Sequence, residues 1–145
     1  MFELGTDGPK SILVAVDGSP TSLRAAAYAA GLARRQSSEL VAVFVHTASA
    51  VTSMRPESMV GIARTNADTA AQLQREVEAG ARRIGIRAQL IERSGDAGSE
   101  IAKVADELKV DAVIVGASTQ VGHRFVGALG VHLIRLARWP VTVVP

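Results

Sequence analysis

The chain has 145 residues, of which 48% are hydrophobic, and 16 basic against 14 acidic residues give a formal net charge of +2. A chain of this length folds around a single core, and its balanced charge and apolar content exclude an intrinsically disordered protein. Aromatic residues make up only 3% of the chain, which argues against single-stranded nucleic-acid binding, and the charges form no basic arm for a duplex. The absence of cysteine excludes disulfides, zinc–thiolate sites and a thiol nucleophile.

Neither a secretion signal nor a membrane span is expected. Residues 1–10 include acidic side chains and lack the apolar centre of a signal peptide. The longest uncharged run, residues 40–54, is shorter than the roughly 18 residues that a membrane span requires. We therefore expect a cytoplasmic protein that does not associate with membranes.

Five short apolar runs alternate with longer segments of helical periodicity. The predicted strands cover residues 11–16, 40–45, 87–92, 111–115 and 141–144. The run at 87–92 alternates only weakly between apolar and polar residues, which favours a strand near the edge of the sheet.

The first connection carries clear helix-start signals, whereas the second does not. After the first strand, Ser19 suits an N-cap and Pro20 the first helical position. Residues 47–62 have no regular period and contain proline and glycine, so we expect a mobile loop there, with a short helical end as the alternative. A helix with apolar residues along one side is predicted to start at Ala63.

Stop and start signals delimit the remaining helices. Gly85 suits the left-handed cap position at the end of the second helix. Asp96 can cap a third helix, and a fourth over residues 131–138 stops at Pro140.

The strand–helix order predicts an α/β fold with one domain over residues 1–145. Right-handed crossovers between successive strands give an open parallel sheet with helices on both faces. Residues 1–9 precede the first strand, and we expect them to form a disordered tail.

Ligands of such sheets bind beyond the carboxyl ends of the strands, where the strand order reverses. For a five-stranded sheet of order 3-2-1-4-5, that point lies between the first and fourth strands. Two connections meet there: the turn Asp17-Gly18-Ser19 and the glycine-rich stretch VGASTQVGHRFVGALG at 115–130.

The residues of these two connections suit a phosphate-containing ligand. Glycines let backbone N–H groups approach an anion at the start of a helix. Asp17 suits a ribose hydroxyl or an exocyclic amine, and His123 and Arg124 would add positive charge on the phosphate side.

A purely structural interpretation of the same residues stays open. Gly116 then only closes a strand-to-helix turn, while Gly127 and Gly130 only let a helix pack on the sheet. Asp17 is then a turn residue, and the basic residues at 123–124 are solvated surface.

No other group of residues indicates catalysis or metal binding. The three histidines, His46, His123 and His132, have neither a histidine four residues away nor carboxylates at ligand spacing, and no serine sits in a nucleophile elbow. Asp111 precedes the fourth strand, at the end opposite the candidate site, which favours a structural role.

Three separated stretches resemble the universal stress protein family. They are ILVAVDGSPTSLRAAAYAAGLA at residues 12–33, DAVIVGAS at 111–118 and VGALGVHLIRLARWPVTVVP at 126–145. The resemblance covers almost the whole chain and implies an adenine nucleotide alpha hydrolase-like fold with a 3-2-1-4-5 sheet. It also implies a homodimer through strand Val141–Val144, which is otherwise an exposed apolar edge.

Nucleotide-binding members of this family carry the pattern G-x2-G-x9-G-[ST]. Gly116 matches the first glycine, but Thr119 stands at the second. Gly127 matches the third with a spacing two residues short, and Ala128 stands at the hydroxyl position. The lost hydroxyl weakens ATP binding by about ten- to a hundredfold, and AMP or cyclic AMP depends less on it.

The resemblance implies that Asp17 contacts the ribose or base and that Val45 lines the adenine pocket. We therefore predict a stress-response module that binds ATP or another adenine nucleotide, with Mg²⁺ only beside a triphosphate and with no dedicated catalysis. The alternatives are a dimeric interaction module without nucleotide, which recruits a regulatory partner, and a slow ATPase. The candidate binding residues are Asp17, Gly18, Ser19, Val45, Gly116, Ser118, Gly122, His123, Arg124, Gly127, Ala128 and Leu129.

Overall fold

The computed structural model describes residues 8–47, 56–120 and 123–145, and it gives no account of the side chains of residues 56–64 and 120–125. Its centre is a five-stranded sheet of order β3-β2-β1-β4-β7, in which every pairing is parallel. This is the predicted 3-2-1-4-5 order, because β7 is the fifth strand of this sheet along the chain. The strands are β1 (Ser11–Ala15), β2 (Glu39–His46), β3 (Ala88–Ser94), β4 (Ala112–Gly116) and β7 (Val141–Val144).

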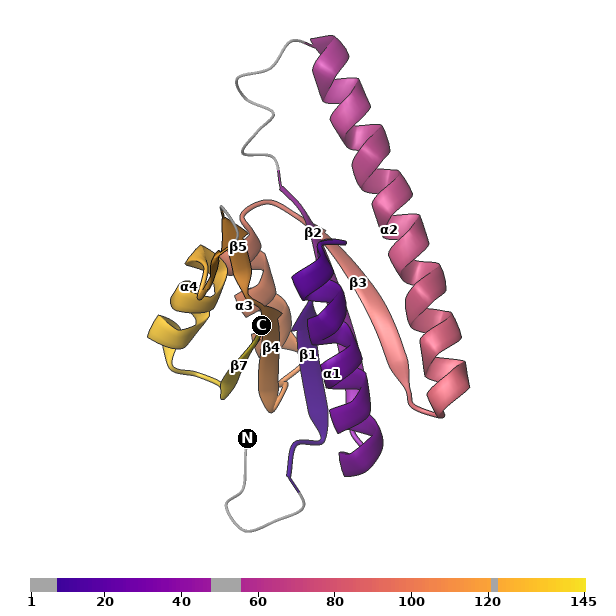
Figure 1. The fold of residues 1–145 in the computed structure, drawn as a ribbon, viewed down its shortest axis with the longest axis vertical. Coiled ribbons are helices and arrows are strands. Elements are labelled where there is room, and N and C mark those ends of the chain that lie inside the picture. The colour runs from indigo at the N-terminus through magenta and orange to yellow at the C-terminus, as the bar shows by residue number, and fades with distance from the viewer. Residues whose placement is uncertain (1–7, 48–55, 121–122) are drawn as a thin grey trace.

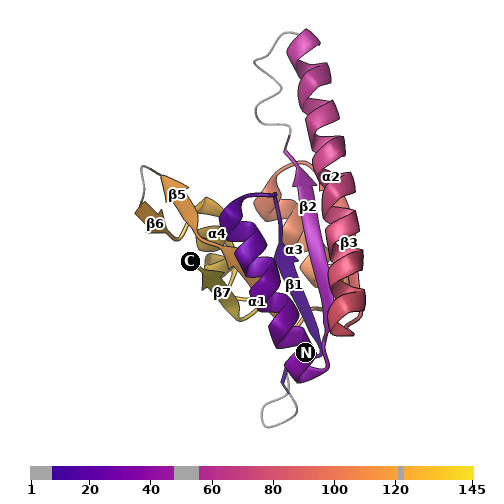
Figure 2. The ribbon, with the colours of Figure 1, turned by 45° about the vertical axis from the view of Figure 1, so that its right-hand side comes forward.

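In the described part of the chain, four helices cover the sheet, two on each face (Figures 1 and 2). Apolar side chains that alternate along β1 and β2 pack on one face against α1 and α2, and on the other against α3 and α4. Both faces of the central strands are thereby buried, as their continuous apolar runs indicate. The helices are α1 (Pro20–Gln36), α2 (Pro56–Ile84), α3 (Ala97–Glu107) and α4 (Ala128–Leu136).

The predicted signals of the first three helices are confirmed, whereas the fourth helix is Ala128–Leu136 rather than 131–138 and ends where Ala137 adopts a left-handed conformation, before Pro140. Ser19 caps α1 through its hydroxyl, which accepts the N–H of Ser22 at 3.3 Å, and Pro20 is the first helical residue. Gly85 follows α2 with φ of 74°, in the left-handed region. The Asp96 carboxylate caps α3 by accepting the N–H of Ser99 at 2.9 Å.

Helix α2 begins earlier than its sequence pattern predicted. It starts at Pro56 rather than Ala63, so the loop predicted over 47–62 ends before Pro56; residues 48–55 lie outside the described part of the chain. Proline is tolerated in a first helical turn, and an interior glycine such as Gly61 costs only about 1 kcal/mol. Both residues were interpreted as helix breakers, and this long helix accommodates both.

A small antiparallel hairpin lies between β4 and α4, where the sequence predicted only a glycine-rich loop. Its strands are β5 (Ser118–Gln120) and β6 (His123–Phe125). Three-residue strands without apolar alternation give no detectable sequence signal.

The start of the described chain is held at the amino edge of the sheet. The Asp111 carboxylate accepts the N–H groups of Lys10 and Ser11 at 2.9 and 3.1 Å, which confirms its predicted structural role. The Ser38 hydroxyl donates to the carbonyl of Pro9. Pro9, which was assigned to a disordered tail, is therefore tied to the fold, while residues 1–7 lie outside the described part.

Candidate functional site

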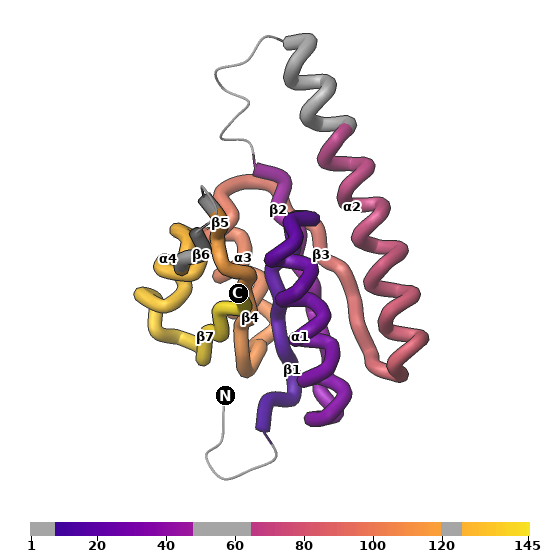
Figure 3. Tube along the Cα trace, in the orientation of Figure 1, coloured from indigo at the N-terminus to yellow at the C-terminus, as the bar shows by residue number. Residues whose placement is uncertain are grey.

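The carboxyl ends of β1, β2 and β4 emerge at one edge of the sheet, the upper edge in Figures 1 and 3. The strand order reverses between β1 and β4, because β2 continues the sheet on one side and β7 on the other. A crevice at such a point is the usual ligand position in an open parallel sheet.

The connection from β1 to α1 is a tight turn built by Asp17, Gly18 and Ser19. The Asp17 carboxylate accepts the N–H of Ser19 at 2.8 Å, and the backbone N–H of Asp17 donates to the hydroxyl of Ser22 at 3.2 Å. Gly18 has φ of 86°, a conformation that L-residues rarely adopt. Asp17 is thus held by the turn while its side chain remains exposed.

The turn also keeps Asp17 ionised. Partial burial acts to raise the pKa of the Asp17 carboxyl, but hydrogen bonds from Ser19 and Ser22 outweigh it and hold that pKa below its ordinary value of 3.8. A negative charge therefore stands at the end of the central strand at neutral pH.

Asp17 and Val45 lie at the carboxyl ends of neighbouring strands, and Val45 faces the α3/α4 side of the sheet. Leu13 and Ala15 of β1 and Val43 and Val45 of β2 belong to the core cluster on the α3/α4 side. Asp17 follows two residues after the end of β1, in the turn that leads to α1. The two residues assigned to the ribose and adenine half therefore stand at the carboxyl ends of neighbouring strands.

Gly116 joins the two connections that meet at this edge. A Cβ built on Gly116 would lie 2.6 Å from the carbonyl carbon and oxygen of Thr21 and 2.8 Å from the backbone nitrogen of Ser22. The end of β4 thus packs directly against the first turn of α1. This contact confirms that the two connections meet, and it shows that Gly116 is required for packing.

Gly127 stands at the start of α4 and contacts Ser118 in the same way. A Cβ on Gly127 would lie 1.8 Å from the hydroxyl oxygen of Ser118. Gly127 is the N-cap of α4 and provides no side-chain hydrogen bond to the helix. The start of α4 therefore packs against Ser118, and the first N–H groups of this helix, in the turn that includes Ala128 and Leu129, have no acceptor within it.

The remaining candidate residues belong to the hairpin. His123 and Arg124 are on β6, paired in backbone register with Gln120 and Thr119. Gly122 lies outside the described residues. The backbone thus brings positions 123 and 124 to the edge that carries Ser118, and their predicted part in phosphate binding stays a prediction.

The sequence that forms this fold matches one protein family over nearly its whole length. The model of the universal stress protein family matches residues 9–145. The chain belongs to the universal stress protein family. No curated protein sequence matches it.

Solved structures of universal stress proteins share the fold of this one. A universal stress protein from Lactobacillus plantarum has a TM-score of 0.77 and 22% sequence identity, with 94% of this chain and 97% of that chain covered. A universal stress protein in complex with cAMP gives a TM-score of 0.68, 21% identity and coverages of 94% and 97%. A family member from Arabidopsis thaliana with AMP bound gives a TM-score of 0.69 and 18% sequence identity, with 94% of this chain and 91% of that chain covered.

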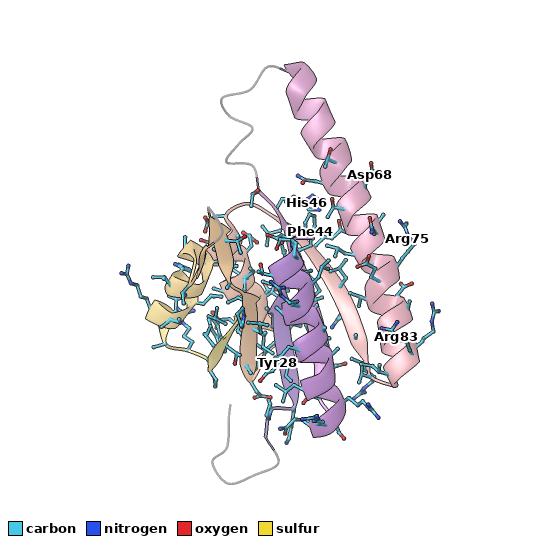
Figure 4. The ribbon with its side chains drawn as sticks, viewed as in Figure 1. Tyr28, Phe44, His46, Asp68, Arg75 and Arg83 are labelled. Atoms are coloured by element: carbon cyan, nitrogen blue, oxygen red, sulfur yellow. The ribbon has the colours of Figure 1, made fainter. Side chains whose placement is uncertain are left out.

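This universal stress protein has a second polar group at the same edge, which sequence reasoning did not single out as a site. His46, the last residue of β2, lies with its Nε2 atom 3.0 Å from the Glu92 carboxylate of β3 and packs edge-on against Phe44 (Figure 4). Phe44 belongs to the core on the α1/α2 side, so this pair faces away from Val45. Its sequence signal was a histidine directly after one predicted strand and an acid at the end of the next.

Helices α3 and α4 of this universal stress protein contact each other near the same edge. A Cβ on Gly98 would lie 2.7 Å from the His132 ring, so the imidazole packs on the first turn of α3. Hydrogen bonds from the backbone and hydroxyl of Ser99 lower the pKa of Asp96, and His132 adds a smaller effect in the same direction. A second carboxylate is therefore ionised at the start of α3.

Two shallow clefts lie at the opposite, amino edge of the universal stress protein fold. One is lined by Glu39 and by the facing ends of α2 and β3, and the other by Asp106, Arg138 and Trp139 with their neighbours. Among the described residues, no group of three or more His, Asp or Glu side chains is arranged to hold a metal ion. None of the described helices combines the length and apolar character needed to cross a bilayer.

Proposed function

We propose that this universal stress protein binds an adenine nucleotide at the carboxyl edge of its sheet and acts as a regulatory binding module without dedicated catalysis. One observation carries the proposal: the ionised Asp17 and the uncapped first turn of α4 flank the point where the strand order reverses. A carboxylate suits ribose hydroxyls or the adenine amine, and free N–H groups at a helix start suit a phosphate.

The solved relatives support this assignment. Two structures with the same fold hold cAMP and AMP. In our proposal the base and ribose lie against Val45 and Asp17, and the phosphate lies at Gly127, Ala128 and Leu129. Gly116 contributes indirectly, because its packing against α1 sets the separation between the two halves.

Isothermal titration calorimetry with AMP, cAMP, ADP and ATP on nucleotide-free protein tests the proposal. We expect Asp17→Ala to weaken binding of the preferred nucleotide by about tenfold or more, since it removes a hydrogen bond to a charged group. Asp106→Ala is the matched control, because Asp106 is an exposed acid that pairs with Arg138 at the opposite edge. Absence of binding for all four nucleotides would refute the proposal.

We further propose that the protein is a homodimer through the open edge of β7. The residues Val141–Val144 are only half-buried, and β4 pairs with one side of the strand alone. Val113 donates to the carbonyl of Pro140, and Ala117 donates to that of Val144. This ladder pattern leaves the N–H of Val143 on the open side.

Val143→Pro removes that donor without touching the β4 pairing, and proline is compatible with an edge strand. Sedimentation equilibrium is expected to give a dimer for the wild type and a monomer for Val143→Pro. A wild-type monomer at micromolar concentration would contradict this part of the proposal. It would leave the nucleotide site unaffected.

A further inference from the structure

We propose that the nucleotide site selects an adenine nucleotide with one phosphate over the triphosphate, and that the Ser118 hydroxyl contacts this phosphate. This inference rests on the proposed function, because it specifies the ligand of the same site. Three features of the described residues carry it: how the loop glycines are packed, where hydroxyls stand, and how charge is distributed.

The two glycines that match the ends of the family's phosphate loop are in close contact with this chain's own atoms. Gly116 abuts the backbone of Thr21, and Gly127 abuts Ser118, both at separations that exclude a Cβ. The intervening segment contains the antiparallel pair β5–β6, in which the backbone groups of alternate residues pair across the two strands. Backbone N–H groups committed in this way are not available to surround a chain of three phosphates.

The start of α4 keeps the donors for a single phosphate. Ala128 provides no hydroxyl, but the hydroxyl oxygen of Ser118 on β5 lies against Gly127, within 1.8 Å of where a Cβ of that residue would be. Among the described residues the Ser118 hydroxyl has no hydrogen-bond partner, whereas the hydroxyls of Ser19 and Ser22 are engaged in the α1 cap. In our proposal the Ser118 hydroxyl therefore supplies the hydrogen-bond donor that Ala128 lacks.

The charges described on β3, α3 and α4 disfavour a highly charged ligand; the side chains of His123 and Arg124, on β6, lie outside the described ones. Asp17 and Asp96 are both ionised at this edge. The only Lys or Arg of α4 is Arg135, in its last turn. The cationic side chains of β3 and α3 are already in ion pairs, Arg93 with Glu107 and Lys103 with Glu100.

A triphosphate brings more negative charge close to these two carboxylates than a monophosphate does. Its outer phosphates also find no unpaired cation on β3, α3 or the first turns of α4. The repulsion between like charges at such a site lowers affinity. A nucleotide with one phosphate keeps the contacts to Asp17, Val45 and the start of α4 and avoids this penalty.

Titration of the nucleotide-free protein with adenosine, AMP and ATP, without added metal, tests the selection. We expect AMP to bind about tenfold or more tightly than both adenosine and ATP, a difference of about 1.4 kcal/mol in each comparison. Equal affinity for adenosine and AMP would overturn the phosphate contact. Tighter binding of ATP than of AMP would overturn the selection, and no binding of any of the three would instead refute the proposed function.

Ser118→Ala tests the hydroxyl, with Thr119→Ala as the matched control. Thr119 is exposed and, as the next residue of the strand, points to the opposite side. We expect Ser118→Ala to weaken AMP binding by about tenfold and to leave adenosine binding unchanged, which also shows that the variant is folded. An equal effect of the two variants on AMP, or a loss of adenosine binding with Ser118→Ala, would overturn the role of Ser118.

Discussion

The two connections that meet at the carboxyl edge use glycine for different physical reasons. Between β1 and α1, Gly18 supplies a left-handed backbone conformation, with φ of 86°. Between β4 and α4, Gly116 and Gly127 have no positive φ and are needed because other atoms occupy the space of a side chain. A glycine count identifies the edge of the sheet but not what each glycine does there.

The largest effect that separates the two connections is expected for Gly116→Ala. The added Cβ meets the backbone of Thr21 at 2.6 Å, so α1 must shift, which we expect to lower the free energy of unfolding by about 3 kcal/mol. Urea denaturation of the wild type and the variant measures this loss of free energy of unfolding. Gly31→Ala is the control, because nothing lies within 4 Å of that Cβ on α1 and alanine favours a helix by about 1 kcal/mol. Wild-type stability of Gly116→Ala would contradict the close contact.

A smaller loss is expected for Gly18→Ala. The nearest atom to the added Cβ is 3.4 Å away, on Thr69, so only the backbone conformation opposes the side chain, at about 1–2 kcal/mol. Gly18→Asn should lose less in the same denaturation experiment, because asparagine tolerates the left-handed region better. Equal losses for the two variants would show that crowding rather than φ determines the need for glycine.

The smallest effect concerns the charge on Asp17. Its pKa in the folded protein is below the ordinary value of 3.8, so its contribution to stability is present above that value and is lost as the pH falls through the folded pKa. Asp17→Asn removes this titration. Between about pH 5 and about pH 2, the free energy of unfolding should therefore fall less in Asp17→Asn than in the wild type. Parallel pH profiles would show that Ser19 and Ser22 do not stabilise the ionised carboxylate.

The sheet and most helix ends could be predicted because their signals are local. The run at 141–144 coincides with β7, and the weakly alternating run at 87–92 is the edge strand β3. Ser19, Pro20 and Gly85 fix their helix ends through the conformations that these residue types favour. Each of these signals needs only a few consecutive residues.

The roles of the site residues could not be predicted in the same way, because they depend on contacts across the sequence. Gly116 is required for packing only because Thr21 lies against it. Ser118 becomes a candidate only because it lies against Gly127. Their sequence spacing resembles a shortened phosphate loop, and spacing alone does not reveal the hairpin between them. Position 17 was found because a strand end and a turn motif coincide there.

The hydrogen bonds from Lys10 and Ser11 to Asp111 join residues 101 and 100 positions apart, and they have a consequence for the order of folding. β1 is the first strand of the described chain and the central strand of the sheet, yet its neighbour β4 follows only after α3. During synthesis, β1 and β2 therefore emerge with one apolar strand edge unpaired, the kind of surface that promotes association between nascent chains. The open edge of β1 can be paired only once β4, about a hundred residues further along the chain, has been made.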